Sequence, residues 1–222
     1  GCGLLGAQFS LACRRNGAIV ISLDLSTKEN NEGLIQVSDN YYECRCDITN
    51  KSSIKKAVTF IKERFTYVDG LINNAANNPQ PGDCKNTNVE FFNEDVWEDD
   101  LRVGLTGAFL ITKYLSPMLK SNPRGASLIF ISSDLGLIAP NQGLYLTNNL
   151  EQKYPPKKPI SYSVVKAGVI GMGRYFSTYW PELNIRSNVL CPGGVKNNQP
   201  QDFLNRIESL IPLGRMADVK SY

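Results

Sequence analysis

The chain has 222 residues, 42% of them hydrophobic and 20% charged, with 24 basic and 21 acidic side chains and no histidine. This length accommodates one large domain or two small ones, and the balanced charge argues against a nucleic-acid partner. The absence of histidine excludes a Ser-His-Asp hydrolase, a histidine-ligated metal and a histidine-based pH switch. No apolar run approaches the ~20 residues that cross a bilayer, so we expect no membrane partner.

The six cysteines contain no Cys-x-x-Cys pair, which argues against a metal site in a chain without histidine. Several lie in apolar segments, where cysteine acts as a small hydrophobic residue. We therefore expect reduced thiols, no bound metal and a cytoplasmic protein without a signal peptide. Because the chain begins with Gly1 rather than methionine, we also expect it to be a fragment of a longer protein.

The first part of the chain alternates helical and strand patterns. Apolar spacing predicts a helix over Leu4–Asn16 that stops at Gly17. The continuous apolar run Ala18–Leu23 predicts a strand covered on both faces. Tyr41–Cys46 is a weaker strand candidate, and Lys51–Phe65 has helical spacing.

The alternation continues through the middle of the chain. Val68–Ile72 and Ser127–Ile131 read as strands, and between them Asn93–Leu119 predicts a long helical segment. We expect that segment to be broken near Gly104 and Pro117, because glycine and proline are the weakest helix formers.

The last part of the chain adds a helix over Ser161–Trp180 that Pro181 helps to end, a strand at Ile185–Leu190 and a helix at Pro200–Ile211. The proline-containing stretch Asn141–Pro159 looks like an insertion. Regular alternation of strands and helices predicts an α/β fold, a doubly wound parallel sheet between two helical layers, with residues 1–222 in one domain.

Glycines open the chain. The run Gly1-Cys2-Gly3-Leu4-Leu5-Gly6 leads straight into a helix, an arrangement that lets the backbone approach a pyrophosphate while free N–H groups receive its charge. Any tight turn before a helix also prefers glycine, so this pattern leaves both interpretations open.

Asp24 closes the first apolar strand, 18 residues beyond Gly6. A carboxylate there can accept hydrogen bonds from the adenosine ribose and would repel a 2′-phosphate, which favours NAD over NADP. The alternative is an Asp that only caps the following turn.

Tyr162 and Lys166 stand four residues apart on one helical face. The ammonium can favour the phenolate and lower the tyrosine pKa from ~10, giving a general acid/base for carbonyl–alcohol interconversion. A second such match, Tyr154–Lys158, contains two prolines that prevent the helix needed to bring its ends together.

Small or polar residues follow the other strands: Asn73-Asn74, Ser132-Ser133 and Cys191-Pro-Gly-Gly194. A serine hydroxyl after a strand could hydrogen-bond a substrate carbonyl, although serine is also common in turns. Because ligands bind at the carboxyl ends of strands in such folds, the combination is more specific than any one motif.

In this order the motifs resemble the short-chain dehydrogenase/reductase family over essentially the whole chain. Gly6 matches the last glycine of the family's Thr-Gly-x-x-x-Gly-x-Gly loop, with Leu4 where the middle glycine usually stands. Residues 73–76 resemble its Asn-Asn-Ala-Gly, and residues 212–216 a stretch often seen near its C-terminal end. Asp47-Ile48 resembles the pair that contacts adenine, and Pro192-Gly193 the turn beside the nicotinamide.

The resemblance implies a Rossmann-type fold and assigns catalysis to Ser133, Tyr162 and Lys166. The residues that it places on the cofactor are Gly1, Gly3, Leu5, Gly6, Asp24, Asp47, Ile48, Asn74, Ala75, Ala76, Tyr162, Lys166, Pro192, Gly193 and Val195. It implies the strand order 3-2-1-4-5-6-7, so we expect a first, central strand before Gly1 and a last strand after Tyr222, and a homodimer or homotetramer.

The sequence departs from the family pattern at three places. Gly104 stands where many members have an Asn that holds a proton-relay water, and the Pro-Gly turn lacks its usual downstream Thr. Ser133 and Tyr162 are 29 residues apart, wider than is common, while Tyr145 at the common spacing has Asn149 rather than Lys four residues on. We expect Tyr145 to be a loop or substrate-pocket aromatic.

The glycine loop and the insertion resemble the branch of flagellin modification protein A, which is associated with bacterial surface-sugar biosynthesis. We therefore expect an NAD(H)-dependent oxidoreductase acting on an alcohol or carbonyl of a small-molecule substrate, a sugar or sugar derivative. The alternatives are an NADP-dependent oxoacyl-type reductase and a non-catalytic dinucleotide-binding protein. The loop lysines Lys153, Lys157 and Lys158 could meet an anionic substrate, but a solvated charged loop is the simpler interpretation.

Overall fold

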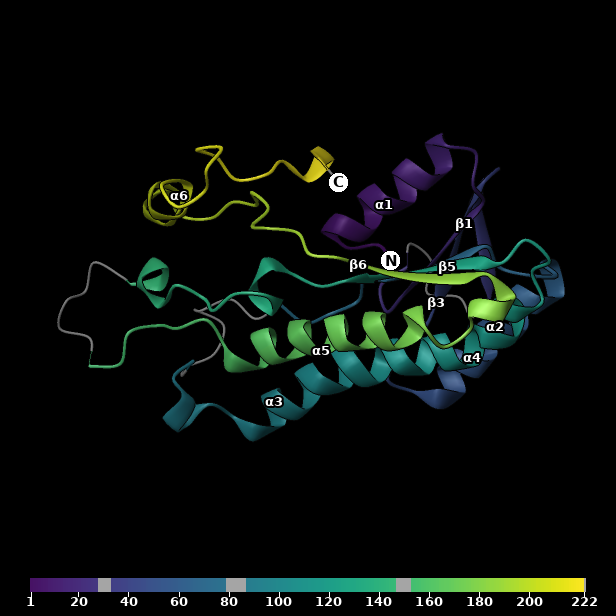
Figure 1. The fold of residues 1–222 in the computed structure, drawn as a ribbon, viewed down its shortest axis with the longest axis horizontal. Coiled ribbons are helices and arrows are strands. Elements are labelled where there is room, and N and C mark those ends of the chain that lie inside the picture. The colour runs from purple at the N-terminus through teal and green to yellow at the C-terminus, as the bar shows by residue number, and fades with distance from the viewer. Residues whose placement is uncertain (28–32, 79–86, 147–152, 222) are drawn as a thin grey trace.

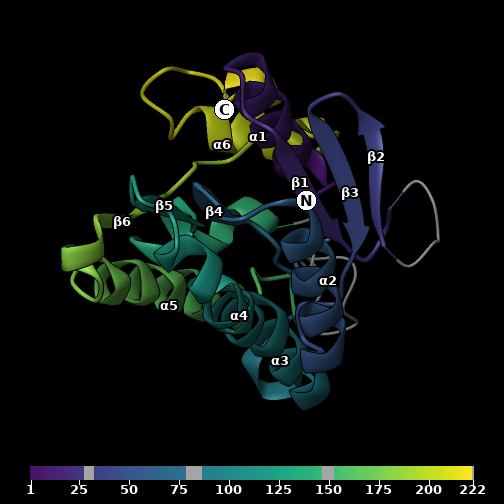
Figure 2. The same ribbon diagram turned by 90° about the vertical axis from the view of Figure 1, so that its right-hand side faces the viewer.

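The computed structural model describes residues 1–27, 33–78, 87–146 and 153–221. Strands lie between two layers of helices, as Figures 1 and 2 show from two directions. Helices α1 (Leu4–Arg15) and α6 (Gln201–Glu208) lie on one side, and the other side carries α2 (Lys51–Arg64), α3 (Glu94–Leu101), α4 (Ala108–Lys120) and α5 (Ile160–Ser177). This is the expected α/β architecture with helices on both faces.

Within the described residues, six strands form two three-stranded sheets with the orders β1-β3-β2 and β4-β5-β6. Their bounds are β1 Val20–Asp24, β2 Leu34–Ser38, β3 Tyr41–Arg45, β4 Gly70–Asn73, β5 Ala126–Ile131 and β6 Ile185–Leu190. Strand β1 runs parallel to β3, and β4, β5 and β6 are all parallel, so the ends of these five strands point the same way.

Strand β2 corrects the expectation of a wholly parallel sheet. It pairs antiparallel with β3, with a register shift between Gln36 and Ser38. Its sequence gave no signal strong enough to predict a strand, because only Leu34 and Ile35 carry apolar side chains next to each other and Val37 is exposed.

Strand β1 is less covered than its continuous apolar run predicts. Ser22 is its one buried residue, whereas its other four residues are partly exposed. The reason is that β1 pairs with β3 on one side and has no partner strand on its other side among the described residues.

Asparagine side chains start two of the helices on the lower layer. The Asn50 Oδ1 accepts hydrogen bonds from the backbone nitrogens of Ser52 and Ser53 at 2.9 and 3.2 Å, which begins α2. Asn93 does the same for α3, with the Asp95 nitrogen at 2.7 Å. Such caps satisfy backbone donors that have no partner within the helix.

The long segment predicted over Asn93–Leu119 is continuous. Helices α3 and α4 are joined by a π-helical stretch over Arg102–Gly107, so Gly104 widens the helix rather than ending it. The expected break at Pro117 is wrong, because this residue lies inside α4. Its neighbours Leu115, Met118 and Leu119 are buried, and their packing outweighs the loss of one backbone hydrogen bond.

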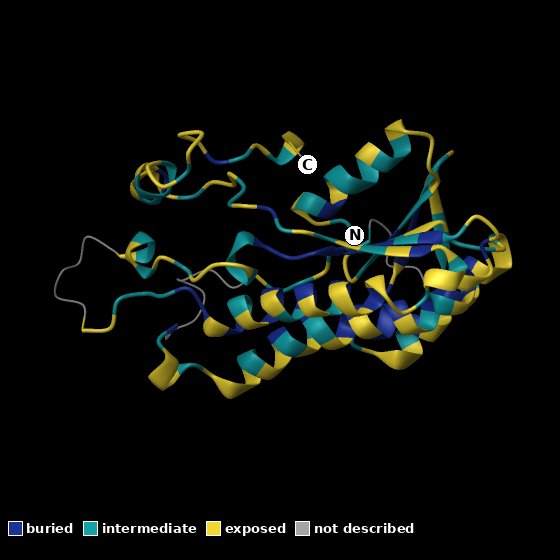
Figure 3. Cartoon of the chain, in the orientation of Figure 1, coloured by how far each residue is buried: buried dark blue, intermediate teal, exposed yellow. Residues whose placement is uncertain are grey.

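The hydrophobic core lies between the strands and the layer of α2, α4 and α5, as the buried stretches in Figure 3 show. Helix α2 contributes Ile54, Ala57, Val58 and Ile61, the one-sided spacing that its sequence predicts. Helix α5 packs on β5 and β6, and its N-terminal end stands at the carboxyl ends of these strands. The start of α5 is therefore held rigidly at the edge where the predicted catalytic residues meet.

Two other boundaries differ from the sequence predictions. Helix α5 ends at Ser177, before the expected Trp180, and α6 covers less than the expected Pro200–Ile211. Within the expected insertion, residues 142–145 form a short 3₁₀ helix, and residues 147–152, including Asn149, lie outside the described residues.

Candidate active site

One cavity of about 1630 Å³ lies at the carboxyl ends of the strands. All but one of the predicted site residues line it: Gly1, Gly3, Leu5, Asp24, Asp47, Ile48, Asn74, Ala75, Ala76, Ser133, Tyr162, Lys166, Pro192, Gly193 and Val195. The exception is Gly6, which is buried and does not line the cavity. Residues that are far apart in the sequence therefore converge on one site, as five separate motifs predicted.

The glycine loop has the form that a pyrophosphate requires. Gly3 begins α1 without any side-chain cap, and the first turn of the helix carries no acidic residue. A Cβ on Gly6 would collide with the carbonyl oxygen of Gly1 and lie 3.1 Å from Nδ2 of Asn74, so only glycine allows this close approach. The uncapped N–H groups beside the cavity are suited to receive an anion.

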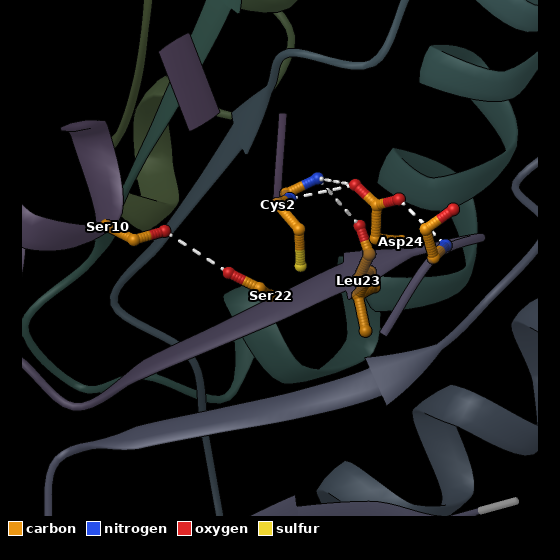
Figure 4. A network of polar contacts seen from close by, with 7 residues as sticks. Cys2, Ser10, Ser22, Leu23 and Asp24 are labelled. Atoms are coloured by element: carbon orange, nitrogen blue, oxygen red, sulfur yellow. Dashed lines mark hydrogen bonds and ion pairs between the residues drawn. The ribbon is translucent and has the colours of Figure 1, made fainter. Parts of the chain in front are cut away.

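Asp24 stands at the end of β1 with its carboxylate held by the glycine loop (Figure 4). Its Oδ2 accepts hydrogen bonds from the backbone nitrogens of Gly1 at 2.7 Å and Cys2 at 2.8 Å, and its Oδ1 from that of Ser26 at 3.0 Å. These three hydrogen bonds leave one of the roughly four acceptor positions of the carboxylate available.

Asp47 and Ile48 line the same end of the cavity. Asp47 Oδ1 accepts hydrogen bonds from the nitrogen and hydroxyl of Thr49, at 2.8 and 2.7 Å. Ile48 packs against the helix behind it, where a Cβ on Gly107 would meet its side chain. The pair therefore forms a fixed wall beside Asp24.

Two adjacent serines follow β5, and their hydroxyls have different partners. Ser132 Oγ donates to the carbonyl oxygen of Lys166 at 2.7 Å and ties the strand to α5. Ser133 Oγ lies 2.7 Å from Oδ1 of Asp134 and interacts with the hydroxyl of Tyr162. The hydroxyl of Ser133 thus lies beside Tyr162, whereas that of Ser132 is used within the fold.

Tyr162 lies at the start of α5, and its environment differs from the sequence expectation. Burial raises its pKa and the charge of Asp134 raises it further, while the hydrogen bond with Ser133 lowers it. The net direction is upward, so the expected lowering of the tyrosine pKa by Lys166 is absent in this arrangement. The phenol is thus held protonated, as a general acid must be before it donates.

Lys166 is buried one helical turn beyond Tyr162. Its Nζ donates to the carbonyl oxygen of Ile131 at 3.0 Å and lies 5.7 Å from the centroid of the Tyr162 ring. Desolvation lowers its pKa to about 8. The ammonium therefore lines the cavity on the same side of the helix as Tyr162.

The structure has no space for a side chain at position 104. A Cβ on Gly104 would lie within 3.0 Å of Cγ1 of Val165. The Asn that many family members carry there has no space, since α5 approaches the π-helical stretch directly. One turn earlier, buried Asp100 accepts a 2.5 Å hydrogen bond from Ser161 Oγ, which fastens α3 to the residue before Tyr162.

The outer wall of the cavity comes from residues after β6. Val195 and Ala217 form a parallel β-bridge, and Arg206 of α6 donates to the carbonyl oxygens of Leu144 at 3.3 Å and Leu146 at 3.0 Å. Tyr145 also lines the cavity, where burial raises its pKa to about 12. The expected pocket aromatic is thus placed beside the site.

Sequence analysis missed one residue. Lys158 was expected to belong to a solvated charged loop, but it is 8% exposed and lines the cavity, with its Nζ 3.9 Å from the centroid of the Tyr162 ring. The expectation of solvation is therefore wrong for this lysine. The sequence offered Lys158 only in the rejected Tyr154–Lys158 match and as a possible contact for an anionic substrate, so the folded chain was needed to place it in the cavity.

Metal-binding clusters and membrane-spanning helices are both absent from the part of the chain that the structure describes. There, no three His, Cys, Asp or Glu residues gather as a metal site would require, and no helix is long and apolar enough to cross a membrane. Five cysteines are free thiols, and Cys84 lies outside the described residues.

Known proteins resemble this chain over most of its length. The family model described as enoyl-(acyl carrier protein) reductase matches residues 5–221. The chain is 27% identical to 3-oxoacyl-(acyl-carrier-protein) reductase of Thermotoga maritima, with 96% of this chain and 80% of that protein covered. It is 26% identical to post-translational flagellin modification protein A of Campylobacter coli, with 99% and 84% covered.

Among solved structures, a short-chain dehydrogenase from Leptospira borgpetersenii with bound NAD⁺ superposes with a TM-score of 0.82. That protein is 25% identical to this chain, and the match covers 98% of this chain and 77% of the other. The Rossmann-type fold expected from the motifs is therefore confirmed.

Proposed function

Because the chain belongs to the short-chain dehydrogenase/reductase family of NAD(P)-dependent oxidoreductases, we propose that it is an NAD(H)-dependent enzyme that interconverts an alcohol and a carbonyl on a sugar or sugar derivative. The observation that carries this proposal is that Asp24, Ser133, Tyr162 and Lys166 line the same cavity. When bound, a nicotinamide cofactor supplies or accepts the hydride.

The preference for NAD rests on charge at the adenosine end of the cavity. Asp24 and Asp47 line that end, and the lysines and arginines among the lining residues belong to residues 158–166 and 206–215 instead. Arg14 on the first helix donates hydrogen bonds to Ser38 and Asn40 and does not line the cavity. A carboxylate accepts from the ribose hydroxyls of NAD and repels the 2′-phosphate of NADP.

The catalytic roles follow from the positions of three side chains. Tyr162 exchanges a proton with the substrate oxygen, and Ser133 positions that oxygen through its hydroxyl. Lys166 holds the ribose of the cofactor through its ammonium group, which lines the same cavity as Tyr162. In reduction the phenol donates its proton to the forming alcohol oxygen, and in oxidation the tyrosinate takes it back.

A polar substrate is supported by the groups beside Tyr162. Asn78, Asn141, Tyr145 and Lys158 line this part of the cavity and offer amide, hydroxyl and ammonium groups. Similarity to flagellin modification protein A favours a sugar in bacterial surface-glycan biosynthesis. Similarity to the Thermotoga maritima protein favours the alternative, an NADP-dependent oxoacyl-type reductase.

The test is a fluorescence titration of the full-length protein with NADH and with NADPH. We expect NADH to bind at least tenfold more tightly, and Asp24→Asn to reduce this preference because the mutant side chain no longer repels the 2′-phosphate. Asp39→Asn, an exposed change on the turn between β2 and β3, serves as the control. Preference for NADPH would favour the oxoacyl-type alternative, and binding of neither nucleotide would contradict both enzymatic functions.

A further inference from the structure

Lys158 is a buried cation at the reaction centre that the assigned catalytic roles do not use. Only 8% of the residue is exposed, and it lines the cavity together with Ser133 and Tyr162. Its backbone is fixed by a 2.9 Å hydrogen bond from its nitrogen to Oε1 of Gln142. Side chain and backbone are thus both held in place, which is the property of a recognition group rather than of a surface lysine.

The ammonium of Lys158 has donor capacity that the described residues do not fill. It carries three N–H donors, and one points to Oδ1 of Asn78 at 3.0 Å. No carboxylate of the described residues lies within ion-pair distance of it. The two acids whose charge reaches it, Asp100 and Asp134, hydrogen-bond to Ser161 and to Ser133 respectively.

Burying an ammonium group without a close counter-charge costs free energy, and this cost lowers the pKa of the group. Desolvation and the nearby charge of Lys166 lower the pKa of Lys158 to about 8. Two lysines lie near Tyr162, Lys158 four residues before it in the sequence and Lys166 four residues after it. Their Nζ atoms are 3.9 Å and 5.7 Å, respectively, from the centroid of the Tyr162 ring. A bound anion would accept hydrogen bonds from the remaining N–H groups of Lys158, and its negative charge would offset the repulsion between the ammonium groups of Lys158 and Lys166.

We propose that Lys158 binds a carboxylate of the substrate, attached next to the carbon that undergoes hydride transfer. The proposal rests on the function proposed above, since it places the reacting oxygen at Ser133 and Tyr162. Nζ of Lys158 lies over the Tyr162 ring, 3.9 Å from its centroid, so a group that Lys158 binds would lie beside the substrate oxygen that Tyr162 contacts. The substrate class is accordingly a 2-hydroxy or 2-oxo acid, including sugar acids of this type.

The experiment compares two probes of similar shape, glycolate and glycolamide, which differ in carrying a carboxylate or an uncharged amide. Dissociation constants are measured by ligand-observed NMR on the full-length protein saturated with NADH at pH 7. We expect glycolate to bind at least tenfold more tightly than glycolamide. Lys158→Met should bring the two affinities to within about twofold, and Lys158→Arg should retain much of the preference because it keeps the charge.

The matched control is Lys153→Met, an exposed lysine of the same loop, which should leave the preference unchanged. Equal affinities in the unmodified protein, or no binding of either probe, would overturn the proposal, as would a preference that survives Lys158→Met. Binding of NADH is measured before any probe is added. Loss of that binding would contradict the proposed function, whereas normal NADH binding without a carboxylate preference would contradict only the role of Lys158.

Discussion

A Cβ atom on Gly104 would lie within 3.0 Å of Cγ1 of Val165, so the space for a side chain on one helix is already filled by the next. Val165 is 4% exposed and lies between Tyr162 and Lys166 in sequence, on the helix that carries both. The replacement of the family's Asn by Gly104 is thus coupled to the packing that positions the catalytic helix. Any relay of protons in this protein must use groups other than a side chain at position 104.

Adding a side chain at Gly104 should destabilise the protein. We expect Gly104→Ala to lower the free energy of unfolding by about 1–3 kcal/mol, the usual effect of overpacking a filled core. Gly171→Ala is the control, because a Cβ there meets nothing within 4 Å and alanine favours the helix by roughly 0.5–1 kcal/mol. Denaturant unfolding measures both, and equal stability of the two variants would show that Val165 yields without cost.

Removing the hydroxyl of Tyr162 should abolish turnover while the cofactor still binds. We expect Tyr162→Phe to reduce kcat by a factor of about 10²–10⁴, the range attributed to a positioned acid or base. NADH affinity should change little, because the ring and its neighbours remain. Tyr175→Phe, on the exposed part of the same helix, is the control. Full turnover by Tyr162→Phe would remove the tyrosine from the mechanism.

The two buried lysines make stability depend on pH. The pKa of Lys158 is lowered to about 8 in the folded chain, against 10.5 for an ordinary lysine. Between these values the unfolded chain binds a proton that the folded chain does not, so the free energy of unfolding rises with pH in this window. Below pH 8 the buried charge is present and its desolvation opposes folding.

We therefore expect Lys158→Met to be more stable than the unmodified protein at pH 7, by up to about 3 kcal/mol, with the difference shrinking by pH 10. Denaturant unfolding at both pH values checks this, and comparison with Lys153→Met removes the effect of the other titrating groups. A difference that stays constant with pH would mean that Lys158 is not desolvated in the folded chain.

Most of the fold could be predicted because strands and helices differ in local pattern. Strands such as Ala126–Ile131 are continuous apolar runs, and α2 repeats its buried residues at helical spacing. Strand β2 and the path of the chain through Pro117 could not be predicted, since each depends on contacts with distant residues. The antiparallel pairing of β2 is set by β3, and the helix around Pro117 is held by the core beneath it.

The candidate site likewise contains residues that could be predicted from the sequence and residues that could not. Residues at or close to the ends of strands, such as Asp24 and Ser133, could be found because the carboxyl ends of parallel strands lie at one edge of a sheet. Lys158 could not, because neighbouring lysines and prolines resemble a solvated loop and only the fold buries it. The rise in the tyrosine pKa also escaped prediction, since the sequence shows the nearby lysine but not the degree of burial.

The bridge between Val195 and Ala217 leads to an evolutionary consequence. The wall that it anchors is built from segments after the last described strand, whereas most of the residues proposed to hold the nucleotide and to transfer the proton belong to the strand ends and α5. Apart from Val195, which is proposed to contact the cofactor, wall residues can change without altering those strand ends. Selection can therefore change which substrate binds in the cavity while the redox chemistry is retained. Two proteins descended from this one could then catalyse the same reaction in different pathways.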